Sequence, residues 1–156
     1  MRIIKTIYMV LLLAFLQGCG SSGMVDNAIS APAEINATGG AAAWAASTSG
    51  AVMYNAPVDN AVQRVTITTD GSPMLLIGQY SAAVIADGTI RANLTRSGGL
   101  GYISQAAVDV LNNKYVSITV IGIDAPPAGS YTYSLNMGSD HNGVAQYRTL
   151  AVVRIK

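Results

Sequence analysis

The sequence predicts an all-β domain built as an antiparallel β-sandwich. From about residue 51, apolar and polar residues alternate with a period of two, and the alternating segments are separated by turn residues such as Asp70-Gly71-Ser72-Pro73 and Asp87-Gly88. About seven or eight short strands of this kind are typical of a two-sheet sandwich. No internal repeat of about 20 to 50 residues is visible, which disfavours a solenoid or a propeller.

The first 19 residues have the three parts of an export signal. Arg2 and Lys5 make the amino terminus positive, Ile7 to Leu16 is apolar, and Leu16-Gln17-Gly18-Cys19 places small residues at a cleavage point. The apolar run is shorter than the roughly 20 residues of a bilayer-spanning helix. Two alternatives are an ordinary secretory signal and an internal helix in which Cys19 is a buried small residue.

The tetrapeptide at residues 16–19 resembles the lipobox of bacterial prolipoproteins, in which the cysteine receives diacylglycerol before cleavage. The resemblance implies a cut between Gly18 and Cys19 and a covalent lipid on Cys19, and we expect no other cofactor. Cys19 is the only cysteine of the chain, so an internal disulfide is excluded. In such lipoproteins an aspartate after the cysteine often causes retention in the inner membrane. Gly20 therefore implies the outer membrane, if the host is Gram-negative.

Cleavage after residue 18 would leave 138 of the 156 residues, a normal length for one domain. Arg2 and Lys5 would be lost, so seven of the nine Lys and Arg would remain against eight Asp and Glu, a formal charge of −1. We therefore expect no nucleic-acid partner. So few charges indicate that part of the surface is covered by partners or by copies of the chain.

Residues 19–50 are predicted to be the lipidated cysteine and a flexible tether rich in Gly, Ala and Ser. Trp44 is expected to pack on the edge of the following domain, with a ligand or partner contact as the alternative. The predicted division is thus a signal peptide at 1–18, the tether at 19–50 and the sandwich at 51–156.

The first predicted strands lie between residues 65 and 96. Val65 and Ile67 alternate with threonines, and the apolar run 74–77 suits a central strand with two apolar faces. Thr89 to Arg96 is the clearest strand, with Ile90, Ala92 and Leu94 on one face and Arg91, Asn93 and Thr95 on the other.

Three further strands are predicted after residue 114. In 115–123 one face is apolar throughout, while Ile121 and Ile123 make the second face apolar as well, so we expect the far end of this strand to be covered on both sides. Pro126-Pro127-Ala128-Gly129 ends it, and the next strand puts Tyr131, Tyr133, Leu135 and Met137 on one face. Asn142-Gly143 predicts a reversal into 145–156, where Tyr147, Ala151, Val153 and Ile155 share a face.

The segment 103–111 fits the sandwich pattern less well. Its apolar residues, Ile103, Ala106, Ala107, Val110 and Leu111, recur at three and four residues, which is helical spacing. A short helix and an irregular strand both remain open.

The succession of strands from Val65 to Ile123, followed by Asp124-Ala125-Pro126-Pro127-Ala128-Gly129-Ser130-Tyr131-Thr132-Tyr133-Ser134-Leu135, resembles small jelly-roll domains of bacteriophage structural proteins. Those domains are similar to the tumour necrosis factor (TNF) and C1q fold, and the resemblance covers residues 60–156. It implies homotrimers at the ends of fibres, spikes and tail tips, packed around an axis lined by apolar and tyrosine side chains. The alternative is that the tyrosines fill the sandwich core and its rim.

Catalysis and metal binding are not predicted. The chain has one histidine and one glutamate, and the neighbouring Ser139, Asp140 and His141 do not converge as a triad would. Asp87, Asp124 and Asp140 lack the spacing of a calcium loop, so no metal site is expected. The Gly-rich segment 97–101 lacks the Lys of a phosphate loop and is interpreted as a β-connection.

These patterns lead to a non-enzymatic, lipid-anchored protein of a phage virion, at a tail tip, fibre or spike, that attaches to the host envelope. It would contact other virion proteins or a host surface receptor through loops at the distal end, including Ser97, Gly98, Gly99, Asp140, His141 and Asn142. Phage fibre-tip proteins normally need no export signal. The alternative is therefore an outer-membrane lipoprotein of the bacterial or infected-cell envelope, with a structural or superinfection-exclusion role.

Overall fold

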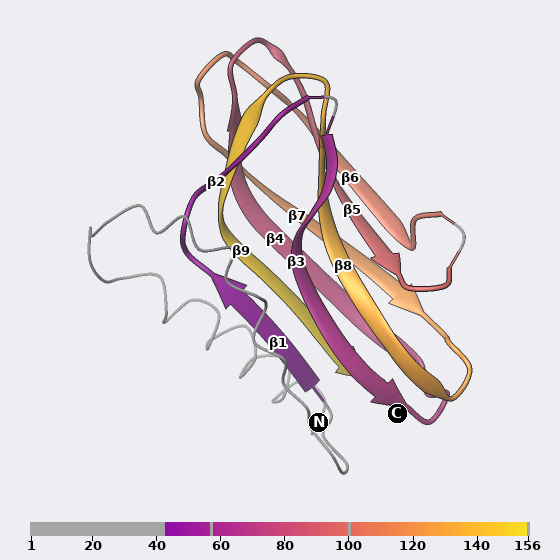
Figure 1. Ribbon diagram of the computed structural model, residues 1–156. Helices are drawn as coiled ribbons and strands as arrows, with labels where there is room; N and C mark the ends of the chain where they lie inside the picture. Colours follow the sequence, from indigo (N-terminus) through magenta and orange to yellow (C-terminus); the bar gives the residue numbers. More distant parts are fainter. Residues whose placement is uncertain (1–42, 57, 100, 156) are drawn as a thin grey trace.

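The computed structural model describes residues 43–155 except 57 and 100, and these residues form nine strands and two antiparallel sheets (Figure 1). The all-β prediction is confirmed. The strands are β1 (Ala43–Thr48), β2 (Val52–Tyr54), β3 (Val58–Thr69), β4 (Met74–Val84), β5 (Gly88–Arg96), β6 (Ser104–Val110), β7 (Val116–Asp124), β8 (Gly129–Ser139) and β9 (Gly143–Arg154).

The two sheets pack face to face (Figure 1). The five-stranded sheet has the order β1-β9-β4-β7, and β2 continues the line of β1 along the same edge of β9. The four-stranded sheet has the order β3-β8-β5-β6. Neighbouring strands in both sheets are mostly distant in sequence, so the sheets are held together by long-range pairing.

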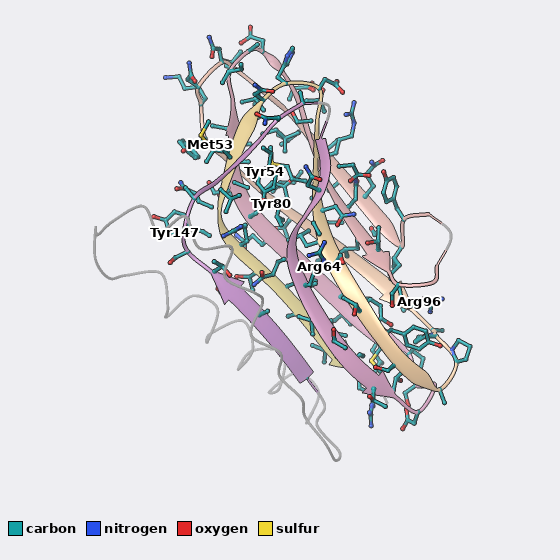
Figure 2. All side chains as sticks on the ribbon, in the orientation of Figure 1. Met53, Tyr54, Arg64, Tyr80, Arg96 and Tyr147 are labelled. Atoms are coloured by element: carbon teal, nitrogen blue, oxygen red, sulfur yellow. The ribbon has the colours of Figure 1, made fainter. Side chains whose placement is uncertain are left out.

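The core between the sheets comes from the inward positions that the alternation predicted. Ile90, Ala92 and Leu94 of β5 are fully buried, as are Tyr133, Leu135 and Met137 of the neighbouring strand β8. In the register of these two strands, Ala92 pairs with Met137 and Leu94 with Leu135. From β4, Tyr80 crosses the core and its hydroxyl donates to the carbonyl of Arg91 at 2.7 Å (Figure 2). Burial raises the pKa of the Tyr80 phenol well above its usual range.

Turns at the two ends of the sandwich define its orientation. Ala43 of β1 pairs with Val153 of β9, so the described chain enters and leaves the domain at the same end. The β5–β6 connection and the Pro126-Pro127 turn lie at this entry end. The β4–β5, β6–β7 and β8–β9 connections lie at the opposite end, where Val84 pairs with Gly143 and Gly88 with Val110.

A β-bulge in β9 departs from the regular alternation. Gln79 pairs with Thr149 and Ser81 with Gln146, so Tyr147 and Arg148 together lie opposite one residue of β4. Tyr147 has a φ of 50° and an exposed side chain (Figure 2). Arg148 is turned inward and its guanidinium donates to the carbonyl of Gly50 at 3.0 Å, which ties the β1–β2 connection to the sandwich.

Two sequence predictions need correction. Residues 104–110 form strand β6, in which Ser104, Ala106 and Val108 are at least half-buried and the residues between them are exposed, so the helical alternative for 103–111 is wrong. The sandwich also begins earlier than residue 51, because β1 lies within the segment expected to be tether and pairs with β9 along its length. The side chain of Trp44 lies outside the described part of the chain.

Candidate functional site

The outer face of the five-stranded sheet carries two rows of aliphatic side chains. Residues paired across strands point to the same face. The pairing gives one row of Ile123, Leu75, Val153 and Ala43, and a second of Ile121, Ile77, Ala151 and Ala45. We call these eight residues the aliphatic rows. They cross four strands without a polar interruption.

Exposure in the aliphatic rows is lowest on β9 and rises toward both edges of the sheet, at Ala45 of β1 and most strongly at β7. Ile121 and Ile123 are 59% and 65% exposed, Leu75 and Ile77 are half-buried, and Ala151 and Val153 are buried. The prediction that the far end of the 115–123 strand is covered on both sides therefore fails within a single chain, because only its core face is covered by described residues. Burial of an isoleucine side chain typically stabilises by about 1.5–3 kcal/mol, so these two side chains favour a covering surface.

The same face becomes polar immediately beyond the aliphatic rows. Thr119, Gln79, Thr149 and Ser47 form the next row across the strands. Ser47 and Thr149 share a hydroxyl hydrogen bond of 3.2 Å. The apolar surface therefore lies in the half of the sheet nearer the entry end. It ends sharply, about halfway along the sheet, at this polar row.

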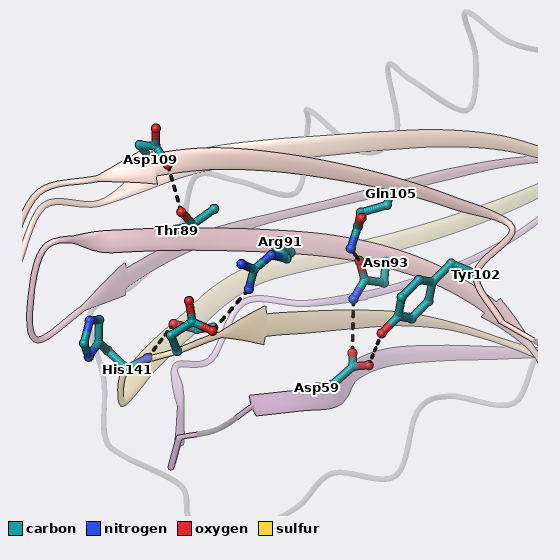
Figure 3. A network of polar contacts seen from close by, with 10 residues as sticks. Asp59, Thr89, Arg91, Asn93, Tyr102, Gln105, Asp109 and His141 are labelled. Atoms are coloured by element: carbon teal, nitrogen blue, oxygen red, sulfur yellow. Dashed lines mark hydrogen bonds and ion pairs between the residues drawn. The ribbon is translucent and has the colours of Figure 1, made fainter.

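The outer face of the four-stranded sheet has a different chemistry (Figure 3). Gln105 of β6 donates from Nε2 to Oδ1 of Asn93 at 2.8 Å, and Asn93 of β5 donates from Nδ2 to Oδ1 of Asp59 in β3 at 3.2 Å. The hydroxyl of Tyr102 donates to the other oxygen of Asp59 at 2.5 Å. We call Asp59, Asn93, Gln105 and Tyr102 the polar platform, with the Asp59 carboxylate as its shared acceptor.

The Asp59 carboxylate also affects the ionisation of the platform. Its hydrogen bond with Tyr102, and its charge, raise the pKa of the Tyr102 phenol above the usual value. Asn93 is only 2% exposed because its neighbours cover it, although the sequence placed it on the solvent face. Tyr102 remains 51% exposed. The platform therefore combines a fixed amide with an exposed aromatic ring.

The loop residues predicted for recognition do not form one surface. Ser97, Gly98 and Gly99 follow β5 at the entry end, whereas Asp140, His141 and Asn142 follow β8 at the opposite end, because β5 and β8 are antiparallel. Since β5 spans nine residues, the two loops are separated by roughly 25 Å or more along the strands.

Several of these loop residues make structural contacts. Ser97 is tied to Thr132 by hydrogen bonds of 2.9 Å in both directions, from its backbone amide and to its hydroxyl. Asn142 accepts from the amide of Ala56 through Oδ1 at 2.7 Å and from the amide of Ile85 through its carbonyl at 3.1 Å. Asn142 thus holds together the neighbouring turns at the opposite end of the sandwich.

The neighbouring residues Ser139, Asp140 and His141 make contacts that belong to the turn. The backbone amide of His141 donates to Oγ of Ser139 at 3.2 Å, and the Asp140 carboxylate pairs with Arg91 at 3.3 Å (Figure 3). Both contacts shape the β8–β9 turn and its junction with β5. Within the described residues, no group of three or more His, Cys, Asp or Glu side chains lies close enough to hold a metal ion.

Asp124 joins three strands at the entry end. Its Oδ2 accepts from Arg96 at 2.8 Å and from the Tyr133 hydroxyl at 2.9 Å, and the Arg96 guanidinium lies 5.0 Å from the centre of the Tyr131 ring. Burial, and the hydrogen bond with Asp124, raise the pKa of the Tyr133 phenol well above its usual range. These contacts leave Asp124 as a structural carboxylate that closes the end of the core.

Gly18 and Cys19 lie outside the described residues, so the structure does not test the predicted cleavage and lipidation. Among the residues that it describes, no helix is long and apolar enough to cross a membrane.

No protein-family model matches the chain, and no curated protein matches its sequence. Among solved structures, it is similar to the Eiger TNF of S. frugiperda, at 14% identity and a TM-score of 0.52, over 74% of this chain and 94% of that one. The fold is a TNF-like jelly roll. The expected similarity to the TNF fold is thereby confirmed.

Two weaker likenesses were also found. One is to infectious bursal disease virus, Gx strain, at 12% identity and a TM-score of 0.47, over 87% of this chain and 38% of that one. The other is to the C-terminal domain of EclA, a sugar-binding protein, at 14% identity and a TM-score of 0.41, over 66% and 78%.

Proposed function

We propose that the chain is a lipid-anchored, non-enzymatic phage virion protein that assembles as a homotrimer and takes part in attachment to the host envelope. The observation that carries the assembly is the pair of aliphatic rows, which leave Ile121 and Ile123 more than half exposed on an edge strand. Contiguous exposed apolar surface on a small domain usually marks an interaction site.

The surroundings of the aliphatic rows also suit an interface between copies. A stable interface buries about 800 Å² on each partner, with an apolar centre and a polar rim. The aliphatic rows would form the centre, and the row of Thr119, Gln79 and Thr149 would extend the contact as part of the rim. Three copies arranged around an axis would cover the rows of every copy, whereas open-ended association would leave some exposed.

The non-enzymatic part of the proposal rests on how the carboxylates are used. Asp59, Asp124 and Asp140 each accept hydrogen bonds from neighbouring strands or from Tyr102, so they act in holding the sandwich and its outer face. A general acid or base acts on a substrate, whereas each of these carboxylates is engaged by an amide, a hydroxyl or a guanidinium group of the domain itself.

The position of the anchor gives the proposed orientation. Cys19 precedes β1, and β1 begins at the entry end of the sandwich. A lipid on Cys19 would therefore tether this end toward a membrane or the virion surface. The opposite end, with the β4–β5, β6–β7 and β8–β9 connections, would point away. A lipid with two or more acyl chains attaches a protein durably to a membrane, whereas one acyl chain gives only weak, reversible binding.

Light scattering on a soluble form that lacks residues 1–19 tests the assembly. This form keeps all the described residues, including the whole buried core between Ala46 and Val153. We expect a mass of three chains at micromolar concentration, and a stable monomer would refute the trimer.

Mass spectrometry of purified virions tests the location. We expect the chain in the particle with a lipid adduct on Cys19. Its absence from virions, together with recovery from the envelope of infected cells, would instead support the alternative of an envelope lipoprotein with a structural or exclusion role.

A further inference from the structure

The polar platform lies on an outer face that neither the core nor the proposed assembly explains. Its four side chains come from β3, β5, β6 and the segment just before β6, and they form one continuous line of hydrogen bonds across the sheet (Figure 3). If the five-stranded sheet is covered by copies of the chain, the four-stranded sheet remains on the outside. This face is then available to a partner.

The platform is fixed before any partner arrives. Asn93 is held from both sides, by Gln105 and by Asp59, and is almost completely buried. The Tyr102 ring is half exposed, but its hydroxyl is fastened to Asp59. A ring that is exposed and immobilised loses little conformational entropy when another molecule stacks on it.

The charges on this face nearly cancel. Arg91 pairs with Asp140, and Asp109 accepts from the Thr89 hydroxyl at 2.8 Å. Arg64 is exposed on β3, opposite Ser134. Together with Asp59, these residues carry three carboxylates and two guanidinium groups, a net charge of only −1, so the face has no strong field that would attract an acidic or basic polymer. Its exposed polar ends are planar carboxylate, amide and guanidinium groups, which can bond adjacent hydroxyls.

We propose that the polar platform binds a neutral saccharide chain. The less polar face of a sugar ring would stack on Tyr102, while its hydroxyl groups would bond with the exposed ends of Gln105, Asp59 and Arg91. This inference rests on the proposed attachment function and names its ligand class. It also places recognition on a sheet face, to which the β5–β6 connection that holds the predicted Ser97, Gly98 and Gly99 contributes Tyr102.

Calorimetric titration of the soluble form lacking residues 1–19 tests the proposal, with cellotetraose, maltotetraose, mannotetraose and chitotetraose as probes. We expect at least one to bind, and Tyr102→Ala to weaken that binding by about tenfold or more, because the stacking ring is lost. Tyr102→Phe keeps the ring but loses its tie to Asp59, so we expect a smaller loss. Tyr115→Ala is the matched control, since Tyr115 is 53% exposed but lies in another loop. We expect this variant to bind the saccharide probe as tightly as the unsubstituted protein does.

Three outcomes would overturn the proposal: no binding to any of the four probes, an equal loss in Tyr102→Ala and Tyr115→Ala, or full binding by Tyr102→Ala while circular dichroism shows all proteins folded. The mass of the same samples separates this inference from the proposed assembly. A monomer that binds a probe would refute the trimer alone, whereas a trimer that binds none would refute the saccharide site alone.

Discussion

The outer faces of the two sheets differ more than any other pair of regions in this molecule. On the five-stranded sheet, eight aliphatic side chains cross four strands in two rows. On the four-stranded sheet, amides, hydroxyls and charged groups bond with one another across three strands. The inner faces, by contrast, are alike, because each consists of aliphatic side chains with one methionine and one fully buried tyrosine. The core therefore fixes the fold, and the outer faces determine what the fold contacts.

The most severe way to break this comparison is to separate the two sheets. Gly78 lies in β4 where an added Cβ would meet Cδ1 of Leu135 at 2.7 Å and side chains of Leu94 and Val120 at 3.2 Å. We expect Gly78→Val to lower the free energy of unfolding by about 1–3 kcal/mol or more, because the packed core cannot accommodate the added carbons. Denaturant unfolding measures this change.

Gly50→Val is the matched control for Gly78→Val. A Cβ at Gly50 meets nothing within 4 Å, so we expect its stability to change by no more than about 0.5 kcal/mol. Equal effects of the two substitutions would show that Gly78 does not set the spacing of the sheets.

The second test removes the special property of the five-stranded sheet alone. Replacing both Ile121 and Ile123 with lysine places two charges in the aliphatic rows, and desolvation of those charges opposes association. We expect the mass in light scattering to fall from three chains to one, with the circular dichroism spectrum unchanged.

Ala107→Lys provides the control for the double lysine variant. Ala107 is also exposed on the outer face of an edge strand, β6, but in the four-stranded sheet. It should keep the mass of three chains. If Ala107→Lys dissociates the protein while the variant at 121 and 123 does not, the interface lies on the other sheet.

Much of the fold was predictable because inward positions follow the period of two. The strand Thr89–Arg96 and the reversal at Pro126-Pro127 were located from such local signals. β1 was missed because its Ala-rich sequence has weak β-propensity, and its strand depends on pairing with β9. The bulge at Tyr147 was not predicted either, since it requires knowledge of which strand lies opposite.

The candidate surfaces were predictable to different degrees. Ile121 and Ile123 were recognisable because apolar residues on both faces of a strand predict two covering surfaces. Asp59 and Gln105, by contrast, are 46 positions apart in the sequence and are linked only through Asn93 and the register of all four strands of the sheet. Polar residues on a wet strand face have no sequence signal that distinguishes a fixed network from ordinary solvent exposure.

The smallest expected effect concerns the tie between Tyr102 and Asp59 on the four-stranded sheet. The folded-state pKa of Tyr102 is raised, so the stability that this tie contributes is complete below the unfolded phenol value of about 10 and is lost as the pH rises through the folded value. In Asp59→Asn the carboxylate acceptor is gone, and we expect the pKa of Tyr102 to fall toward its usual value. NMR of ring-labelled tyrosine resolves this titration from those of the other seven tyrosines.

Asp109→Asn is the control for the Tyr102 titration, because Asp109 lies on the same face and accepts from Thr89 instead of Tyr102. We expect the raised pKa of Tyr102 to persist in this variant. If both substitutions lowered it equally, the cause would be the summed negative charge of the face, and the ring would not be fastened by Asp59. The preorganisation on which saccharide stacking depends would then be lost, while the aliphatic rows on the opposite sheet would be unaffected.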